Sequence, residues 1–412
     1  MTERQQLLGI LGLIYLSECI RWVRRGGVVF NRAPDLRVWR KSPLLNNSHG
    51  DLHIGWPLPP FGEFLVGRGL PWSIDTEGLV TATKTSLHPD GAAPQAILRL
   101  TWEECARITV EGERLFWNRK VLWLADTAVE AARLGAFLRT AATLPPSERE
   151  ARLNTTATAL FDVATIRSRW ESSQSTLKPL RIAGSALWTG MFLLLPLTVW
   201  QWGWTPPLWI GIPTLFLGSF WIAQRLHQLH TQWFPTARDE RFRIVLLAAL
   251  SPVTAIRSAE LLSRPRFEEF HPAAVAMALL PRDAADPFCG QLWRELRHPR
   301  LPGPSVHADG TGILDRWHER LLGAFREAAL ANGFDPARWE APPPKSDSSH
   351  ARYCPRCHSQ STAAASSCRE CGGLPLTEWP TEPTTNAASL AADASVPSPD
   401  PRPAAASSPP SP

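Results

Sequence analysis

The 412-residue chain lacks long blocks of charge of one sign, and it has few cysteines outside one cluster. Its net charge is +5, but no long run of Lys and Arg is present of the kind that binds a phosphate backbone. Nucleic acid is therefore a disfavoured partner. Of the seven cysteines, Cys19, Cys105 and Cys289 stand alone, and three isolated thiols do not make a disulfide framework. We therefore expect a reducing compartment.

The chain also lacks the short motifs that mark common enzyme classes. It has no Gly-x-Ser-x-Gly elbow, no phosphate-binding glycine loop and no dinucleotide fingerprint. His227-x-x-His230 places two imidazoles on one helical face, but no nearby carboxylate completes a metal site, so we interpret it as an interfacial polar stretch. His318 precedes Glu319 without the second histidine of a zinc-protease helix. The sequence assigns no catalytic residue and no cofactor-binding residue.

Two apolar stretches without any charged residue are present at Ile182–Trp200 and Leu208–Ala223. Each approaches the roughly 20 residues that a helix needs to cross the hydrocarbon core of a membrane. The uncharged turn between them is rich in tryptophan, as interfacial aromatic belts are. Basic residues such as Arg181 and Arg225 lie outside the pair, which places both flanks in the cytoplasm. The sequence predicts a two-helix transmembrane hairpin; the alternative is a buried core hairpin of a large soluble protein.

The N-terminus contains a shorter apolar run, Leu7–Leu16, followed by the basic residues Arg21, Arg24 and Arg25. Ten apolar residues resemble a signal-peptide core, but no small-residue cleavage site follows and the basic cluster comes after the run. We expect a membrane-embedded or interfacial helix here. Whether Leu7–Val23 spans the membrane is left open.

Short runs rich in Leu, Val and Ile, separated by turns, predict strands between Leu79 and Leu124. Thr127 and Glu130 then have the spacing of a capping box that opens an amphipathic helix. Meandering strands closed by one helix resemble the pleckstrin-homology family over about residues 28–144. This resemblance implies a module that is often placed beside membranes. The alternative is a generic small α+β domain packed on the hairpin.

The region after the hairpin is predicted to be mostly helical. Ser251 precedes Pro252 at a helix start, and further helices are expected over Pro272–Leu280, Pro287–Leu296 and Ile313–Ala331. Beyond Trp379 the chain is Pro, Ala and Ser with almost no large apolar residue, so we expect a disordered tail.

Near the C-terminus, two Cys-x-x-Cys pairs are separated by ten residues: Cys354 with Cys357, and Cys368 with Cys371. Two residues between thiolates let a tight turn aim both sulfurs at one point, and two such turns supply a tetrahedral sulfur cage. The alternative is a redox-active dithiol. However, thioredoxin-like enzymes place one pair at a helix start, whereas two pairs lie here on a Ser- and Ala-rich loop.

This pattern resembles the zinc-ribbon family over about Tyr353–Leu376, with Gly372-Gly373 after the second pair, where a knuckle needs positive φ. The resemblance implies a structural Zn²⁺ held by four protein ligands, with no position open for water or substrate. His350 and His358 lie nearby but are not needed as ligands.

Taken together, these observations predict a multi-domain α+β membrane protein. From the N-terminus its expected parts are an apolar interfacial or membrane helix (1–27), a β-rich domain with a C-terminal helix (28–150), a polar connector (151–180), the transmembrane hairpin (181–225), a helical cytoplasmic domain (226–340), a linker (341–352), the zinc ribbon (353–378) and the disordered tail (379–412).

We expect a membrane-anchored binding or scaffold protein of the inner (cytoplasmic) membrane, multi-pass, whose partners are the lipid bilayer and another protein. One alternative is a membrane-bound enzyme with its site in the helical domain, which a pocket gathering His271, Asp283 or His318 would favour. Another is an accessory subunit of a transporter, although two uncharged spans line no ionic path. The oligomeric state is not predicted.

Overall fold

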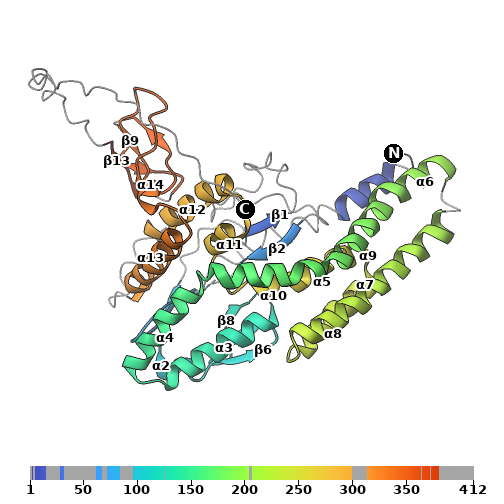
Figure 1. Cartoon of the computed structure of the whole chain (residues 1–412), viewed down its shortest axis with the longest axis horizontal. Helices are drawn as coiled ribbons and strands as arrows, with labels where there is room; N and C mark the ends of the chain where they lie inside the picture. Colours follow the sequence, from blue (N-terminus) through green and yellow to red (C-terminus); the bar gives the residue numbers. More distant parts are fainter. Residues whose placement is uncertain are drawn as a thin grey trace, which may run out of the picture.

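The computed structural model describes residues 2, 5–14, 28–31, 62–66, 72–83, 96–125, 127–203, 207–298, 313–362, 364–371 and 373–379. The expected tail beyond Trp379 lies outside these residues, as does most of the N-terminal region after the apolar helix Gln5–Ile14. Within them the fold is mixed. Small antiparallel sheets come first, long helices follow, and a small β module lies near the C-terminal end (Figure 1).

Most strands of the β-rich part form two antiparallel three-stranded meanders. The first contains β3 (Trp72–Asp75), β4 (Gly78–Thr83) and β5 (Ala96–Thr101), and the second contains β6 (Thr109–Glu111), β7 (Arg114–Trp117) and β8 (Lys120–Leu124). A separate pair joins β1 (Val28–Asn31) to β2 (Gly62–Val66), and the short helix α2 (Trp102–Cys105) links the two meanders. The strands predicted between Leu79 and Leu124 are confirmed.

Helix α3 (Ala128–Thr143) closes this part of the chain, as predicted. Thr127 is its N-cap, and the Thr127 hydroxyl accepts a hydrogen bond from the backbone N–H of Glu130 at 3.0 Å. The apolar stripe of the helix faces inward and is buried, namely Ala131, Leu134, Leu138 and Ala141. The order of strands and helix is thus confirmed, while the pleckstrin-homology resemblance stays a prediction.

Helix α4 (Pro146–Ala159) leads into one continuous helical segment over Val163–Trp202, made of α5 (Val163–Thr189), the π-helical turn η3 (Gly190–Leu194) and α6 (Leu195–Trp202). By length and composition, this is the one helix among the described residues that could cross a membrane. The expected second span, Leu208–Ala223, does not meet the same test, because polar residues follow from Gln224 onward.

The chain then turns back through η4 (Pro207–Gly211) into α7 (Ile212–Trp233), which packs alongside α5 (Figure 1). Pro196 and Pro213 each stand two residues after a π-helical turn. Because a proline ring collides with the carbonyl four residues earlier, the wider π turn gives it room. At the base of the pair, Gly184 permits close approach, since a Cβ there would lie 2.9 Å from the Ile256 carbonyl oxygen.

Seven further helices complete the fold among the described residues. They are α8 (Arg238–Leu250), α9 (Pro252–Ile256), α10 (Ser258–Phe267), α11 (Pro272–Leu279), α12 (Arg282–Arg297), α13 (Ile313–Ala331) and α14 (Pro336–Glu340). The predicted bounds of α13 hold, and α11 ends one residue before the predicted Leu280. Helix α12 begins at Arg282 instead of the predicted Pro287. Pro287 removes the amide partner of the Asp283 carbonyl and its ring crowds that carbonyl, but both residues are exposed, so the carbonyl can tilt outward and bond water.

One hydrophobic core runs from the β-rich part through α3, α4 and the start of α5 to α11–α14. At its centre the Phe161 ring stacks on Phe325 at 5.0 Å between ring centroids, and His271 packs against both rings. A second core lies between α5 and α7–α10 at the base of the long helices. The β-rich and helical parts are therefore held together by shared apolar contacts.

A buried polar contact also joins these parts at the N-terminus of α3. The Thr127 hydroxyl donates to Glu268 Oε1 at 2.7 Å, across a sequence separation of 141 residues. Burial raises the pKa of the Glu268 carboxyl well above its usual 4.5, and the nearby Glu130 carboxylate raises it further. The native fold therefore binds the Glu268 proton more tightly than the unfolded chain does.

The substitution Glu268→Gln should stabilise the protein at pH 8 and have little effect near pH 5. A native pKa above the unfolded value gives stability that is complete below about pH 4.5 and is lost as the pH rises through the raised native pKa. The amide keeps an acceptor for Thr127 and carries no charge. Thermal unfolding at the two pH values measures the effect.

Glu269→Gln is the matched control for this substitution. The neighbouring Glu269 is partly exposed and forms ion pairs with Arg133 and Arg169, so its loss should lower the melting temperature slightly at pH 8. An equal gain from Glu268→Gln at both pH values would contradict the assigned cause.

Candidate metal centre

The C-terminal module consists of two short β-hairpins whose turns carry the cysteines. β9 (Arg352–Tyr353) pairs with β10 (Gln360–Ser361), and β11 (Ser367–Cys368) pairs with β12 (Leu374–Pro375). β13 (Thr377–Glu378) adds to the other edge of β9. Each hairpin thus begins just before or at the first cysteine of a pair and turns back after the second.

Both turns close in the same way. The N–H of His358 donates to the Cys354 carbonyl at 2.9 Å, and the N–H of Gly373 donates to the Cys368 carbonyl at 2.8 Å. Both donors have positive φ, +62° at His358 and +91° at Gly373. The positive φ expected after the second pair is confirmed at Gly373, which is a residue that adopts it without steric cost. Gly372 lies outside the described residues.

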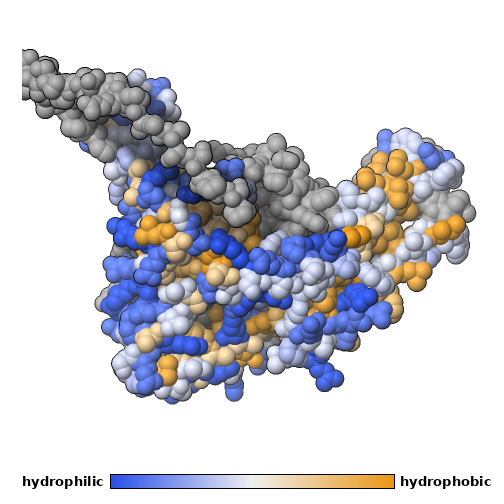
Figure 2. Space-filling model, in the orientation of Figure 1, coloured by the Kyte–Doolittle hydropathy of each residue, from blue (hydrophilic) through white to orange (hydrophobic). Residues whose placement is uncertain are grey.

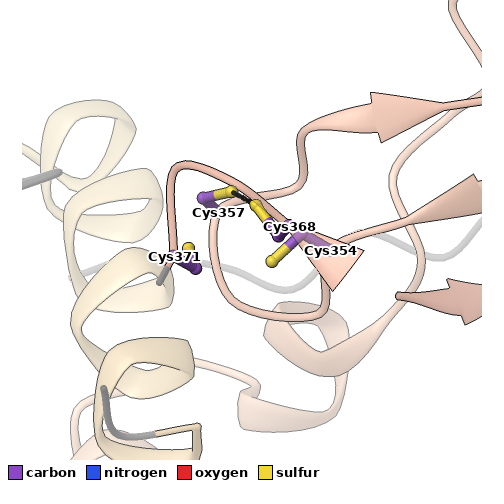
Figure 3. A group of neighbouring side chains, drawn as sticks. All are labelled: Cys354, Cys357, Cys368 and Cys371. Atoms are coloured by element: carbon purple, nitrogen blue, oxygen red, sulfur yellow. Dashed lines mark hydrogen bonds between the residues drawn. The ribbon is translucent and has the colours of Figure 1, made fainter. Parts of the chain in front are cut away.

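The four sulfur atoms converge on one point (Figure 3). They all lie within 4.8 Å of one another, and the Sγ atoms of Cys357 and Cys368 are 3.6 Å apart. Sulfurs that bind one zinc ion at about 2.3 Å in a tetrahedron are about 3.8 Å from each other. The residues present therefore fit a tetrahedral metal ion, and zinc is the ion that such a four-sulfur set favours.

The surroundings of the sulfurs match a closed structural site. The side chains of Cys354, Cys368 and Cys371 are buried, and Cys357 is only partly exposed. Hydrogen bonding from the Cys354 thiol, together with the contacts of Cys357 with Ser359, lowers the pKa of Cys357 to about 5 against the effect of burial. One thiolate is thus available for metal at neutral pH. Four protein sulfurs leave no open coordination position.

The C-terminal module contacts the helical part through Arg294 of α12, whose Nε donates to the Arg356 carbonyl at 3.3 Å. The Nη1 of the same side chain donates to the Trp339 carbonyl of α14 at 3.3 Å. The Trp379 indole donates to the Pro343 carbonyl at 2.8 Å and ties the end of the module to the linker. These partners are far apart in the sequence and carry no motif, so sequence reasoning missed them.

The histidines near the cysteines take no place among the sulfurs. His358 packs edge-on against Tyr353 at 6.2 Å between ring centroids, and His350 Nδ1 lies 3.1 Å from the Ser346 hydroxyl oxygen. His227 is exposed while His230 is fully buried, so the two imidazoles of that motif lie in different surroundings.

The enzyme alternative required a pocket that gathers His271, Asp283 or His318. The His271 ring is instead buried in the main core, where it caps α11 by accepting from the Ala273 N–H at 3.3 Å. Burial lowers the pKa of His271 to about 3. In the part of the chain that the structure describes, the four cysteines are the only group of three or more His, Cys, Asp and Glu side chains placed to hold a metal.

Comparisons with protein-family models, with curated proteins and with solved structures found no match for this chain. The support for a zinc-ribbon-like module consists of the cysteine spacing, the two paired hairpins and the convergence of the four sulfurs.

The full-length chain should purify with about one zinc ion, measured by elemental analysis against protein concentration. Cys368→Ser should remove most of that zinc, because three sulfurs remain. Cys289→Ser, at a buried cysteine of α12 far from the cluster in sequence, should leave it in place.

His358→Gly tests whether the imidazole is a ligand. Glycine adopts the left-handed φ of this position, so zinc content should stay unchanged and stability should change by no more than about 1 kcal/mol. Loss of zinc in this variant, or its retention in Cys368→Ser, would show that the ligand set is wrong.

Proposed function

We propose that this chain is a membrane-anchored binding or scaffold protein, held by a hairpin of two helices, with its soluble parts and a structural zinc ribbon facing the cytoplasm. The observation that carries the proposal is an exposed, charge-free belt on α5–α6 and α7.

The candidate membrane helix is a surface helix. Only 17% of its most apolar stretch is buried, whereas a core helix of a soluble protein would be mostly buried. Large side chains that face outward on it include Ile182, Leu194 and Leu197, which are exposed by 55–60%. On α7, Leu217 and Phe220 are exposed by 71% and 65%. A soluble protein rarely leaves so large an apolar surface uncovered.

On both helices the belt ends at the same distance from the turn that joins α6 to α7. Leu187 lies beside Gly218 and Leu195 beside Gly211, so positions along the two antiparallel helices match in opposite directions. When the same pairing is followed away from the turn between α6 and α7, Ile182 lies opposite residue 223. Ile182 is the first exposed apolar residue after the charged base of α5, and on α7 the exposed residues are strongly polar from Gln224 onward, with Thr214 the one exposed polar residue before it.

The upper limit is marked by tryptophan. Trp200, Trp202 and Trp209 are exposed by 54%, 66% and 78%, and hydrophobic residues gather at this far end of the helices (Figure 2). From Ile182 to Trp202 the helical rise gives about 30 Å, the thickness of a hydrocarbon core. An apolar belt of that height with tryptophan at one rim and charge at the other supports a hairpin in a bilayer.

The cysteines support a cytoplasmic location of the soluble parts, and this argument does not depend on the helices. Cys105 and Cys289 are free and buried, and a four-thiolate metal site needs reduced cysteines. A hairpin returns the chain to the side that it left, so the β-rich part, the helical part and the zinc ribbon share one compartment.

The proposed topology predicts opposite behaviour of reporters at two positions. A phosphatase that is active only outside the cytoplasm should be active when inserted after Gly203 and inactive when fused after Pro412. A fluorescent protein that folds only in the cytoplasm should give the reverse pattern at the same sites. Fluorescence from the insertion after Gly203 would contradict the hairpin.

The scaffold role predicts a protein partner that depends on the zinc ribbon. Proteins that co-purify with the full chain from solubilised membranes should include at least one that is lost with Cys368→Ser and kept with Cys289→Ser. Quantitative mass spectrometry of the three samples measures this. Identical protein sets from all three would remove the ribbon as a docking module while leaving the topology intact.

A further inference from the structure

Helix α8 (Arg238–Leu250) carries a second uncovered apolar surface, outside the proposed hairpin. One face of the helix is buried and contains Glu240, Ile244 and Ala248. The opposite face should be polar in a helix that meets water. Instead it carries four large apolar side chains, exposed by 44–69%: Phe242, Leu246, Leu247 and Leu250.

The position of α8 follows from its packing. It begins five residues after α7 ends and packs along α7, so the two helices run in opposite directions. Its 13 residues rise about 20 Å, which brings Leu250 approximately level with Trp221. Trp221 and the adjacent Phe220 are the lowest exposed apolar residues of the belt on α7. Along the helix axes, the apolar face of α8 therefore begins where the exposed apolar belt of α7 ends.

The charges of α8 lie at its other end. Arg238, Asp239 and Arg243 are exposed and belong to its first two turns, while every exposed side chain from Leu246 to Leu250 is apolar. On α7, Arg225 is exposed approximately level with Leu246, and its guanidinium lies 5.7 Å from the centre of the Trp221 ring. Exposed arginine beside tryptophan and leucine is the composition of a headgroup boundary.

We infer that the C-terminal half of α8 is a third lipid-contacting element, which lies at the boundary between acyl chains and headgroups on the cytoplasmic side. This inference rests on the proposed membrane hairpin and extends it. The occupant is the bilayer itself, because the face adjoins the surface of α7 that the hairpin presents to lipid. Arg225 lies at the height of the phosphates and favours anionic headgroups.

This placement has a consequence for the β-rich part. The N–H of Val129 at the start of α3 donates to Glu240 of α8 at 3.2 Å, and Arg243 of α8 forms an ion pair with Glu113 beside β7. Helix α8 thus connects the membrane surface directly to the β-rich part. A helix that lies in the headgroup region holds that part against the bilayer without a flexible connection.

Photocrosslinking of the full-length protein tests the inference. The photoreactive residue benzoylphenylalanine replaces Leu247 or Leu250, and the protein is reconstituted into vesicles of phosphatidylethanolamine and phosphatidylglycerol. Leu217 on α7 is the hairpin reference, and Asp239 is the aqueous reference on the same helix. Mass spectrometry of the irradiated protein identifies each adduct. Lipid adducts at Leu247 and Leu250 should match those at Leu217 and exceed those at Asp239 several-fold.

The possible outcomes separate the inference from the proposed function. Lipid adducts at Leu217 with none above the Asp239 level at Leu247 and Leu250 would overturn the inference and leave the hairpin standing. Crosslinks from Leu247 or Leu250 to a second copy of the chain, or to the helix Gln5–Ile14, would also overturn it, because protein would then cover the face. Absence of lipid adducts at all three leucines would overturn the hairpin itself.

Discussion

The apolar side chains that α5, α6 and α7 expose are the main physical constraint on this protein, because they must be kept from water. Water in contact with apolar surface costs about 25 cal/mol for each Å², and the belt on α5–α6 and α7 consists of large Leu, Ile, Phe and Trp side chains. No other part of the described chain covers them. A bilayer removes this cost without any specific partner, and it also fixes which ends of the helices meet water.

The soluble parts are organised around the base of these helices. Two apolar cores meet there, one shared by the β-rich and helical parts and one between α5 and α7–α10. Polar contacts such as Thr127 with Glu268 and Val129 with Glu240 connect the start of α3 to the helices that follow the hairpin. Because these contacts join segments more than 100 residues apart, the β-rich part is fixed to the helices at the base of α5 and α7.

Local signals predicted much of the fold and the cysteines of the candidate metal site. The capping residue Thr127, the helix start at Ser251-Pro252 and the range of α13 are each encoded within a few neighbouring residues, and all three are found. The four cysteines are likewise a local pattern. Helix α12 was misjudged at Pro287 because tolerance of a proline depends on solvent at the freed carbonyl, which is a tertiary property.

The features missed from the sequence share a non-local origin. The apolar face of α8 looks like an ordinary core stripe until the fold shows that its other face is the buried one. The bonds from Arg294 to two backbone carbonyls have no sequence signature, since any long-range pair of donor and acceptor can meet this way.

The uneven burial of the four sulfurs has a consequence for metal exchange. Cys357 is the one cysteine of the four that solvent can reach, and the Ser359 hydroxyl lies 3.1 Å from its sulfur. The same hydroxyl donates to the Glu370 carboxylate at 2.7 Å. Competing thiols and chelators must therefore attack at this corner, where a negative charge repels anionic reagents. For an ion held by these four sulfurs, the rate of exchange would depend on how readily the Cys357 sulfur is displaced, separately from the equilibrium affinity of the site.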